Sequence, residues 1–346
     1  MVHKKVLVVG GTGHFGNLLV EDLCRHTECD LFVPSRSVVD LRDIRSVDSA
    51  LSEIFVAICA AGPFQTLPVT LAELCLRRGI HYIDLADDRN FVKKVRALVP
   101  RDGRDLPAIC SGWSTVSAFS GALARIGTAG LDKVDAIYIH MAPGNRLPRG
   151  TGTIASLLQS VGQQFSLCRD GDWHTVRGWS EPRRFSFPAP VGGRTGYLVD
   201  VPDHELFPAL FNARRVEFRT ASELGGLNAS VSVLGWLVWK GLVRGWSSWS
   251  GTFRRLAGLF GFLGHDWGAV GVEVVGSIGG RTMTRRVSVV ANSGGQRIAV
   301  MPACIMTARL LSGSKYHGLV SPADWITQEE LRVECEKRGF RLIVED

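Results

Sequence analysis

Apolar runs of strand length alternate with stretches of helical periodicity over the first part of the chain. Val6 to Val9 is a continuous apolar run, and Leu18, Leu19 and Leu23 follow it on one face of a predicted helix. The helical pattern that begins at about Leu67 stops at Gly79, a residue suited to a C-terminal cap. Further strand-like runs are DLFV, IFVAIC, HYIDLAD and LPAIC. Alternating strands and helices of this kind predict a doubly wound parallel sheet of the Rossmann type.

The pattern changes at about Leu131, after which strand-like runs follow one another with few helices between them. KVDAIYIHM, GYLVDV, VEFRT, GVEVVGSIGG and TRRVSVVA predict a second α+β domain built on a mostly antiparallel sheet. We therefore expect a dinucleotide-binding domain at 1–122 and a substrate and dimerisation domain at 123–299. Residues 300–346 are expected to form C-terminal helices that return to the Rossmann domain.

A glycine-rich turn joins the first strand to the first helix. Glycines at Gly10, Gly11, Gly13 and Gly16 can be aligned as G-x-x-G-x-x-G or as G-x-G-x-x-G. A main chain without Cβ atoms can curve sharply and approach a pyrophosphate, whose charge then meets the free N–H groups of the helix start. The strand before the turn and the helix after it are the context that this motif requires. The turn predicts a dinucleotide cofactor.

The tip of the second predicted strand indicates which dinucleotide is bound. An acidic residue that would bind a ribose 2′-hydroxyl is missing there, and Ser35, Arg36 and Ser37 take its place. A guanidinium and two hydroxyls suit a phosphate, so the tip favours NADP(H) over NAD. The alternative is that Arg36 is an ordinary solvated surface charge.

Composition narrows the class of protein further. The chain has 346 residues, of which 45% are hydrophobic, and its formal net charge is +7. Its basic residues occur as dispersed pairs without a recognition motif, so we expect no nucleic-acid partner. The eight cysteines show no zinc-binding spacing, and no metal is expected. MVHKK leads directly into the first strand without an apolar signal segment, which predicts a cytoplasmic protein.

A tryptophan-rich segment, residues 231–264, interrupts the second domain. Trp236, Trp239, Trp246 and Trp249 lie in it among glycines and basic residues, so it lacks the unbroken apolar span of a membrane crossing. Three roles stay open, namely a cover over the substrate pocket, a dimer contact and contact with a membrane surface. The first two are preferred.

Several polar residues could donate the proton of a reaction or hold a substrate. Asp87 and Asp88 follow a predicted strand, and Tyr138 and His140 share one face of another because strand side chains alternate. The alternative for His140 is a satisfied structural residue. Arg149, Arg194 and Tyr197 are candidate anchors for a substrate carboxylate, although Arg194 can equally hold a turn. No hydrolase or NTPase motif accompanies them.

Taken together, these stretches resemble the saccharopine dehydrogenase-like oxidoreductases. The likeness is carried by GGTGHFG, AAGPFQ, YIDLADD, SGWSTVSAFSGAL, RGTGT and the ending LLSGSKYHGLVSPADWITQEELRVECEKRGF. It implies a Rossmann domain completed by C-terminal helices, an inserted substrate domain, hydride transfer with a nicotinamide cofactor and frequently a homodimer. Some members form or oxidise secondary amines through an imine, and other members look like trans-acting enoyl reductases.

The expected function is that of an NADP-dependent oxidoreductase acting on an imine or secondary amine of a small organic substrate. Alternatives are a trans-acting enoyl reductase and a non-catalytic nucleotide-binding scaffold at a membrane surface. His140, Tyr138 and Asp87 are the candidate catalytic residues. By motif, the expected cofactor residues are Gly10, Thr12, Gly13, His14, Phe15 and Gly16 for the pyrophosphate, Ser35, Arg36 and Ser37 for the 2′-phosphate, Asp40 and Leu41 for the adenine side, Ala60, Ala61, Gly62 and Pro63 for the ribose, and Ser111, Gly112, Trp113 and Ser114 for the nicotinamide.

Overall fold

The computed structural model describes residues 4–100, 105–146, 158–249, 251–253, 255 and 263–346. The chain divides into two compact units. Residues 1–119 and 297–325 form the first unit, and residues 120–296 and 326–346 form the second. The predicted boundaries at 122/123 and 299/300 lie close to the first two of these divisions, 119/120 and 296/297. Of the segment 300–346, which we expected to return to the Rossmann domain, residues 326–346 belong to the second unit.

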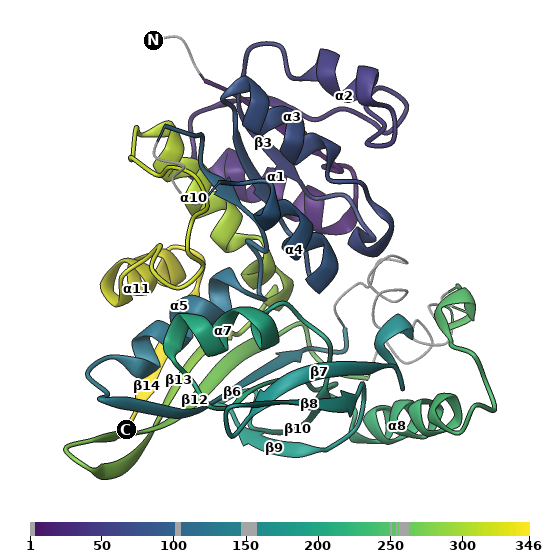
Figure 1. Cartoon of the computed structure of the whole chain (residues 1–346), viewed down its shortest axis with the longest axis vertical. Helices are drawn as coiled ribbons and strands as arrows, with labels where there is room; N and C mark the ends of the chain where they lie inside the picture. Colours follow the sequence, from purple (N-terminus) through teal and green to yellow (C-terminus); the bar gives the residue numbers. More distant parts are fainter. Residues whose placement is uncertain (1–3, 101–104, 147–157, 250, 254, 256–262) are drawn as a thin grey trace. The chain divides into compact units, whose positions relative to one another are not determined.

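The first unit is built on a parallel five-stranded sheet in the order β2-β1-β3-β4-β5 (Figure 1). The predicted Rossmann-type class is therefore confirmed. The strands are β1 (Lys5–Val9), β2 (Asp30–Phe32), β3 (Ile54–Cys59), β4 (His81–Asp84) and β5 (Ile109–Cys110). The helices are α1 (His14–His26), α2 (Ile44–Ala50), α3 (Thr70–Arg78), α4 (Arg89–Ala97) and α10 (Met301–Leu311), with the 3-10 turns η1 (Phe64–Thr66) and η3 (Gly295–Ala299).

The chain order of this sheet reverses at β1, which lies between β2 and β3. Ligands of such sheets bind outside the carboxyl ends of the strands at that reversal. Helix α3 ends as predicted, because Gly79 takes a left-handed conformation with φ +70° and its N–H reaches back to the last turn. Helix α10 joins the unit from far along the chain, and it contacts α1, β3 and β4.

The second unit contains a seven-stranded sheet in the order β14-β13-β12-β6-β11-β10-β9. All its pairings are antiparallel except that of β6 with β11, which confirms the predicted mostly antiparallel sheet. A separate hairpin joins β7 and β8. The strands are β6 (Lys133–Pro143), β7 (Gln164–Arg169), β8 (Asp172–Arg177), β9 (Arg183–Ser186), β10 (Gly193–Leu198), β11 (Val216–Thr220), β12 (Gly268–Ile278), β13 (Arg281–Ala291) and β14 (Phe340–Glu345).

Helices cover one face of the second sheet. Helix α5 lies against β12 so closely that a Cβ at Gly127 would come within 2.6 Å of Val274 Cγ2. The helices of this unit are α5 (Ala118–Thr128), α7 (Asp203–Phe211), α8 (Gly225–Trp239) and α11 (Gln328–Glu336), and η2 (Ser247–Trp249) is a 3-10 turn. Strand β14 was not among the expected elements. It completes the edge of the sheet beside β13.

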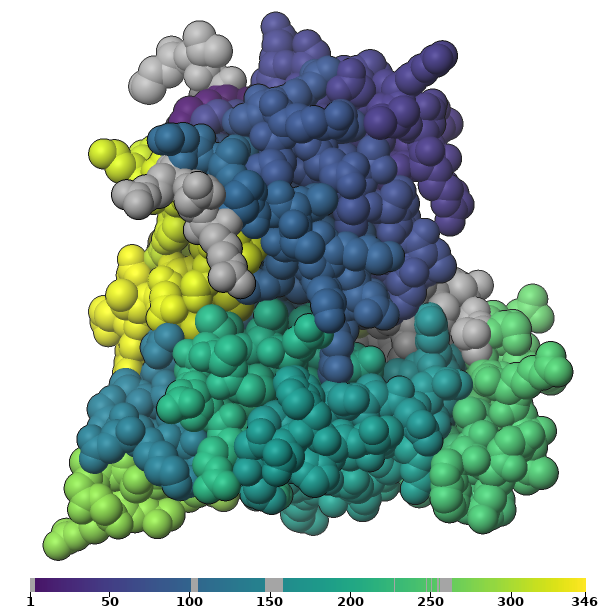
Figure 2. All heavy atoms as spheres, in the orientation of Figure 1, coloured from purple at the N-terminus to yellow at the C-terminus, as the bar shows by residue number. Residues whose placement is uncertain are grey.

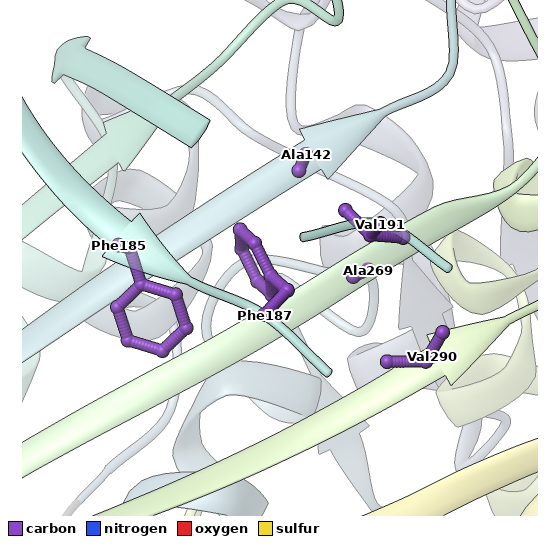
Figure 3. Close-up of a cluster of buried hydrophobic side chains, with 6 residues drawn as sticks. All are labelled: Ala142, Phe185, Phe187, Val191, Ala269 and Val290. Carbon is purple, nitrogen blue, oxygen red and sulfur yellow. The ribbon is translucent and has the colours of Figure 1, made fainter. Parts of the chain in front are cut away.

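The opposite face of the second sheet closes on itself. Strand β9 is three places from β6 in the sheet, yet the ring of Phe185 in β9 stacks on His140 of β6 with centroids 4.7 Å apart. The sheet therefore curls. Figure 3 shows the buried cluster that results, made of Ala142, Phe185, Phe187, Val191, Ala269 and Val290. Gly271 of β12 permits the curl, because a Cβ there would lie 2.6 Å from the Phe185 ring.

Within the described ranges, no helix combines the length and the apolar composition that a bilayer-spanning segment requires.

Candidate functional site

The glycine turn after β1 is formed by main-chain segments in direct contact. Gly10 has φ +81°, and a Cβ on it would lie 2.5 Å from the backbone nitrogen of Ala61. A Cβ on Gly16, in the first turn of α1, would lie 2.0 Å from the carbonyl oxygen of Gly10. Both positions therefore require glycine for reasons of space. The turn brings the start of α1, the end of β1 and the end of β3 together at one edge of the sheet.

The start of α1 is open to solvent. Gly13 is the N-cap and supplies no side-chain hydrogen bond, and the first turn of the helix contains no acidic residue. Thr12 and Gly13 are exposed, and His14 and Phe15 are half-buried. The first N–H groups of an α-helix have no intrahelical acceptor, and the helix dipole adds positive potential there. This end of the helix suits a pyrophosphate.

The turn after β2 gathers two hydroxyls and one guanidinium. The N–H groups of Val38 and Val39 both donate to the carbonyl oxygen of Ser35, which makes the turn tight. Ser35 Oγ lies 2.8 Å from Ser37 Oγ, and both side chains are exposed. Arg36 is exposed too and forms no ion pair with any residue that the structure describes. The three side chains are thus available to a phosphate.

The residues expected near the adenine and the ribose lie on the neighbouring turns. Asp40 is half-buried and its Oδ1 accepts from the N–H of Arg42, while Leu41 is buried. Ala60 and Ala61 are half-buried at the end of β3, where Ala60 N donates to Val9 O over 2.8 Å. Gly62 is exposed and Pro63 is half-buried.

A buried aspartate organises the ends of β4 and β5. Asp84 Oδ1 accepts from Ala86 N at 3.0 Å and from Gly112 N at 2.8 Å, and Asp84 O accepts from Trp113 N at 2.7 Å. Burial raises the pKa of Asp84 to about 6, although hydrogen bonds from Gly112, Ser111 and Ala86 oppose the rise. Asp84 positions the turn of residues 111–114.

The side chains expected beside the nicotinamide are buried in that turn. Ser111 is 3% exposed, and Trp113 is fully buried with its ring 5.9 Å from that of Trp325. Gly112 has φ +77° and Ser114 is also buried. Asp87 is exposed after β4, and Asp88 caps α4 by accepting from Phe91 N at 2.7 Å.

His140 and Tyr138 lie on one face of β6, but both are buried. His140 is 1% exposed, its Nε2 has no hydrogen-bond partner among the described residues, and burial lowers its pKa to about 3, with help from Arg219 and Arg183. Tyr138 is 9% exposed, with the guanidinium carbon of Arg183 3.5 Å from its ring centroid. His140 is therefore neutral at physiological pH, and its burial separates the ring from solvent in this conformation.

A buried network of ion pairs surrounds these two residues. Glu217 Oε1 accepts from Arg169 Nε and Oε2 from Arg219 Nη1, each over 2.7 Å. Burial alone would raise the pKa of Glu217, but the guanidinium of Arg219 and then that of Arg169 lower it below its usual value. Glu273 is held in the same way between Arg183 at 2.5 Å and Arg286 at 2.7 Å. Because these carboxylates are saturated by arginines, we assign the network a structural role.

The predicted substrate residues are not brought together. Arg149 lies outside the described residues. Arg194 and Tyr197 are three positions apart in β10, so their side chains leave opposite faces of the strand. Tyr197 stacks on Trp179 at 5.8 Å, and Arg194 Nη2 lies 4.0 Å from Glu223 Oε1.

Glu223 and His265 form a polar pair that the sequence analysis did not single out. Glu223 Oε1 lies 2.6 Å from His265 Nδ1, and Oε2 accepts from the N–H groups of Asn145 and His265, each at 2.9 Å. Partial burial would raise the pKa of Glu223, but these hydrogen bonds, that of the His265 side chain first, lower it below its usual value. The His265 side chain is 55% exposed, and its ring stacks on Trp267 at 3.6 Å.

This arrangement suits acid–base chemistry. The ionised carboxylate of Glu223 holds the proton on Nδ1 of His265, so Nε2 is the nitrogen that can give or take a proton. The guanidinium of Arg194 beside Glu223 adds positive charge. Only the residue types could have signalled this site, because Glu223 and His265 are far apart in sequence and share no motif. Among the described residues, no group of histidine, cysteine or acidic side chains is placed to hold a metal ion.

Comparison with known proteins gives structural similarity alone. Neither the known family models nor the curated proteins include a match. Among solved structures, the chain is similar to DAP dehydrogenase of C. glutamicum in complex with DAP, with 13% identity, 94% of each chain covered and a TM-score of 0.48. It is also similar to an engineered D-amino acid dehydrogenase bound to NADP+, with 14% identity, 93% of this chain and 94% of the other covered, and a TM-score of 0.49.

A third similar structure is the amine dehydrogenase of Mycobacterium smegmatis, with 10% identity, 93% of this chain and 96% of the other covered, and a TM-score of 0.43. The similar structures thus include NAD(P)-dependent dehydrogenases. At these identities and TM-scores the similarity concerns the fold alone.

Proposed function

We propose that the chain is an NADP(H)-dependent oxidoreductase that transfers hydride to or from an imine or secondary amine of a small organic substrate. The observation that carries this proposal is the glycine turn, where Gly10 and Gly16 are in backbone contact that excludes any Cβ. The turn leaves the start of α1 open to an anion, and it lies where the strand order reverses. The sequence resemblance to saccharopine dehydrogenase-like oxidoreductases favours imine chemistry.

The choice of NADP(H) rests on the turn after β2. Arg36 offers forked hydrogen-bond donors, and the hydroxyls of Ser35 and Ser37 lie beside it in the sequence. Residues 35–37 include no acidic side chain that would bind the free ribose 2′-hydroxyl of NAD. Ser35, Arg36 and Ser37 would hold the 2′-phosphate, and the glycine turn would hold the pyrophosphate. When bound, the nicotinamide supplies the hydride of the reaction.

For the proton of the reaction, the described geometry favours His265 over the residues named from the sequence. His140 and Tyr138 are buried, whereas His265 is half exposed and oriented by Glu223 and Trp267. We infer that Nε2 of His265 gives or takes the proton and that Arg194 attracts an anionic group of the substrate. Asp87, which is exposed after β4, is retained as the second candidate.

The test combines nucleotide binding with turnover. Calorimetry with the full chain should show NADPH binding more tightly than NADH, and NADPH oxidation should follow with at least one imine or one pair of oxo acid and amine. If the chain turns over enoyl substrates alone, the proposed imine chemistry is wrong and the reaction is enoyl reduction. Nucleotide binding without turnover of any compound in the panel would favour the scaffold, and absence of nucleotide binding would overturn the proposal.

A further inference from the structure

Helix α8 and the segment after it expose an unusual amount of apolar surface. Val233 is 59% exposed, Trp236 48%, Trp239 46%, Leu242 67% and Trp249 53%. We call these five residues the tryptophan surface. Figure 1 labels the helix α8 and shows it in green, and the same segment is coloured green in Figure 2. Large exposed apolar side chains gathered in one segment point to a site of interaction with a partner or a membrane.

Contacts along α8 fix the helix to the second unit. Gly235 lies against Gly162, where an added Cβ would come 2.5 Å from the Gly235 carbonyl oxygen. Ser232 Oγ donates to Trp179 O at 3.1 Å, and Asn228 Nδ2 donates to Thr195 O of β10 at 3.3 Å. The tryptophan surface is presented to solvent by an anchored element.

The turn after α8 keeps the rest of the surface in place. Gly241 has φ +72°, and the N–H groups of Gly241 and Leu242 donate back to Val238 O and Leu237 O, which is a Schellman turn. Further on, Trp246 Nε1 donates to Leu234 O at 3.1 Å. These bonds hold the segment after the helix against α8.

Positive charge accompanies the aromatic rings. The guanidinium of Arg177 lies 4.0 Å from the ring centroid of Trp239, and Lys240 Nζ lies 4.5 Å from it on the exposed side. Arg244 and Arg255 are exposed as well. In the sequence, no aspartate or glutamate occurs between Glu223 and Asp266. The segment that carries this surface therefore combines tryptophan, aliphatic and cationic side chains and contributes no carboxylate.

We propose that the tryptophan surface binds an anionic lipid bilayer from the side, with its tryptophans at the level of the headgroups. Tryptophan prefers this interface because its ring is apolar and its N–H is polar, and lysine and arginine are attracted by anionic headgroups. A second copy of the chain is a poorer occupant. A twofold contact brings the same patch against itself, so the positive charges of Lys240 and Arg244 would face a patch of the same sign, and the segment itself supplies no carboxylate to neutralise them.

This inference is independent of the proposed activity, because it rests on exposure and charge in a different part of the second unit. It is tested by co-sedimentation of the full chain with vesicles of phosphatidylcholine alone and of phosphatidylcholine mixed with phosphatidylglycerol. The chain should sediment with the mixed vesicles and bind the neutral ones more weakly. Added salt should reduce the difference between the two vesicle types.

Two pairs of substitutions separate the contributions of aromatic and charged residues. Trp236→Ala with Trp239→Ala should lower the partition coefficient at least about tenfold on both vesicle types. Lys240→Glu with Arg244→Glu should lower it about tenfold or more on the anionic vesicles alone, since each cation near such a surface contributes a several-fold factor. The matched control is Trp173→Ala, because Trp173 is 57% exposed in the same unit but lies on β8 outside the tryptophan surface.

Thermal unfolding monitors the fold of every variant, and the exposed positions predict melting temperatures near that of the unchanged chain. The proposal fails if the chain does not bind anionic vesicles, or if Trp173→Ala weakens binding as much as the paired tryptophan substitution. It also fails if light scattering shows a dimer that Trp236→Ala with Trp239→Ala dissociates, because the surface would then be an interface between copies.

Discussion

Arg36 offers a direct test of nucleotide choice at the level of one residue. Its guanidinium is exposed between two serines and makes no ion pair among the described residues. Replacing it by aspartate puts a negative charge where the 2′-phosphate would bind, and a lost charge-assisted hydrogen bond costs about 1.5–3 kcal/mol. We expect Arg36→Asp to weaken NADPH binding at least about tenfold and to leave NADH binding nearly unchanged in calorimetry. Equal losses for both nucleotides would show that Arg36 does not read the phosphate.

His265 is tested by steady-state kinetics with an imine, or a pair of oxo acid and amine, that the unchanged chain turns over. His265→Gln removes the group that exchanges the proton, and such groups contribute about 10²–10⁴ in rate. The expected result is a fall of about hundredfold in kcat with unchanged affinity for NADPH. His174→Gln is the matched control, since His174 is an exposed histidine of the same unit on β8. If both variants keep full activity, another residue supplies the proton.

The buried His140 should make the free energy of unfolding depend on pH. Its pKa is about 3 in the fold against an ordinary value of 6.5, so between these two pH values the unfolded chain binds the proton and the folded chain does not. The contribution of His140 to the free energy of unfolding is fully present above pH 6.5. It decreases as the pH falls toward 3, by at most about 4–5 kcal/mol. Urea unfolding at several pH values should show a smaller loss for His140→Gln. An identical slope would mean that His140 is protonated in the fold or lies open to water.

The contact between the glycine turn and α1 can be tested at the scale of the element. Gly16→Ala places a Cβ 2.0 Å from Gly10 O, so the helix must move away from the turn. We expect a loss of about 2 kcal/mol or more in unfolding free energy, in the range of overpacking, and a clear loss of nucleotide affinity. Gly79→Ala is the control, because a Cβ there meets nothing within 4 Å and pays only the left-handed backbone penalty of about 1–2 kcal/mol. It should keep the affinity of the unchanged chain.

Elements with local signals could be predicted from the sequence, and those set by distant partners could not. The glycine turn, the strand before it and the end of α3 at Gly79 are local features, and the structure has them where expected. Strand β14 escaped prediction, because its place is set by pairing with β13 far earlier in the chain. The face of β6 was identified, but not the burial of His140, which depends on Phe185 of β9 covering it.

The candidate site follows the same division. The cofactor residues lie on turns that the motifs located, and their roles stay predictions. The pair of Glu223 and His265 has no sequence signal, since a loop after β11 and a loop before β12 meet only through tertiary structure. The predicted homodimer and cytoplasmic location also stay predictions.

At the scale of the whole molecule, the second unit depends on the last residues of the chain. Phe340 of β14 is 3% exposed and pairs with Ala291 of β13. Phe340→Ala should lower the unfolding free energy by about 3 kcal/mol or more, as for other buried phenylalanines, and should expose the edge of β13. Chemical unfolding measures the loss. Val344→Ala, at a more exposed position of the same strand, should cost much less, and equal costs would contradict the assigned burial.

Neither unit is a continuous stretch of chain, because each is completed by a segment from near the C-terminus. Helix α10 covers α1, β3 and β4, and its residues are among the most buried of the first unit. During synthesis, one apolar side of the five-stranded sheet therefore stays uncovered until α10 has left the ribosome. The nascent chain exposes this apolar surface until α10 is synthesised. A chaperone that binds the exposed surface should therefore raise the yield of folded protein.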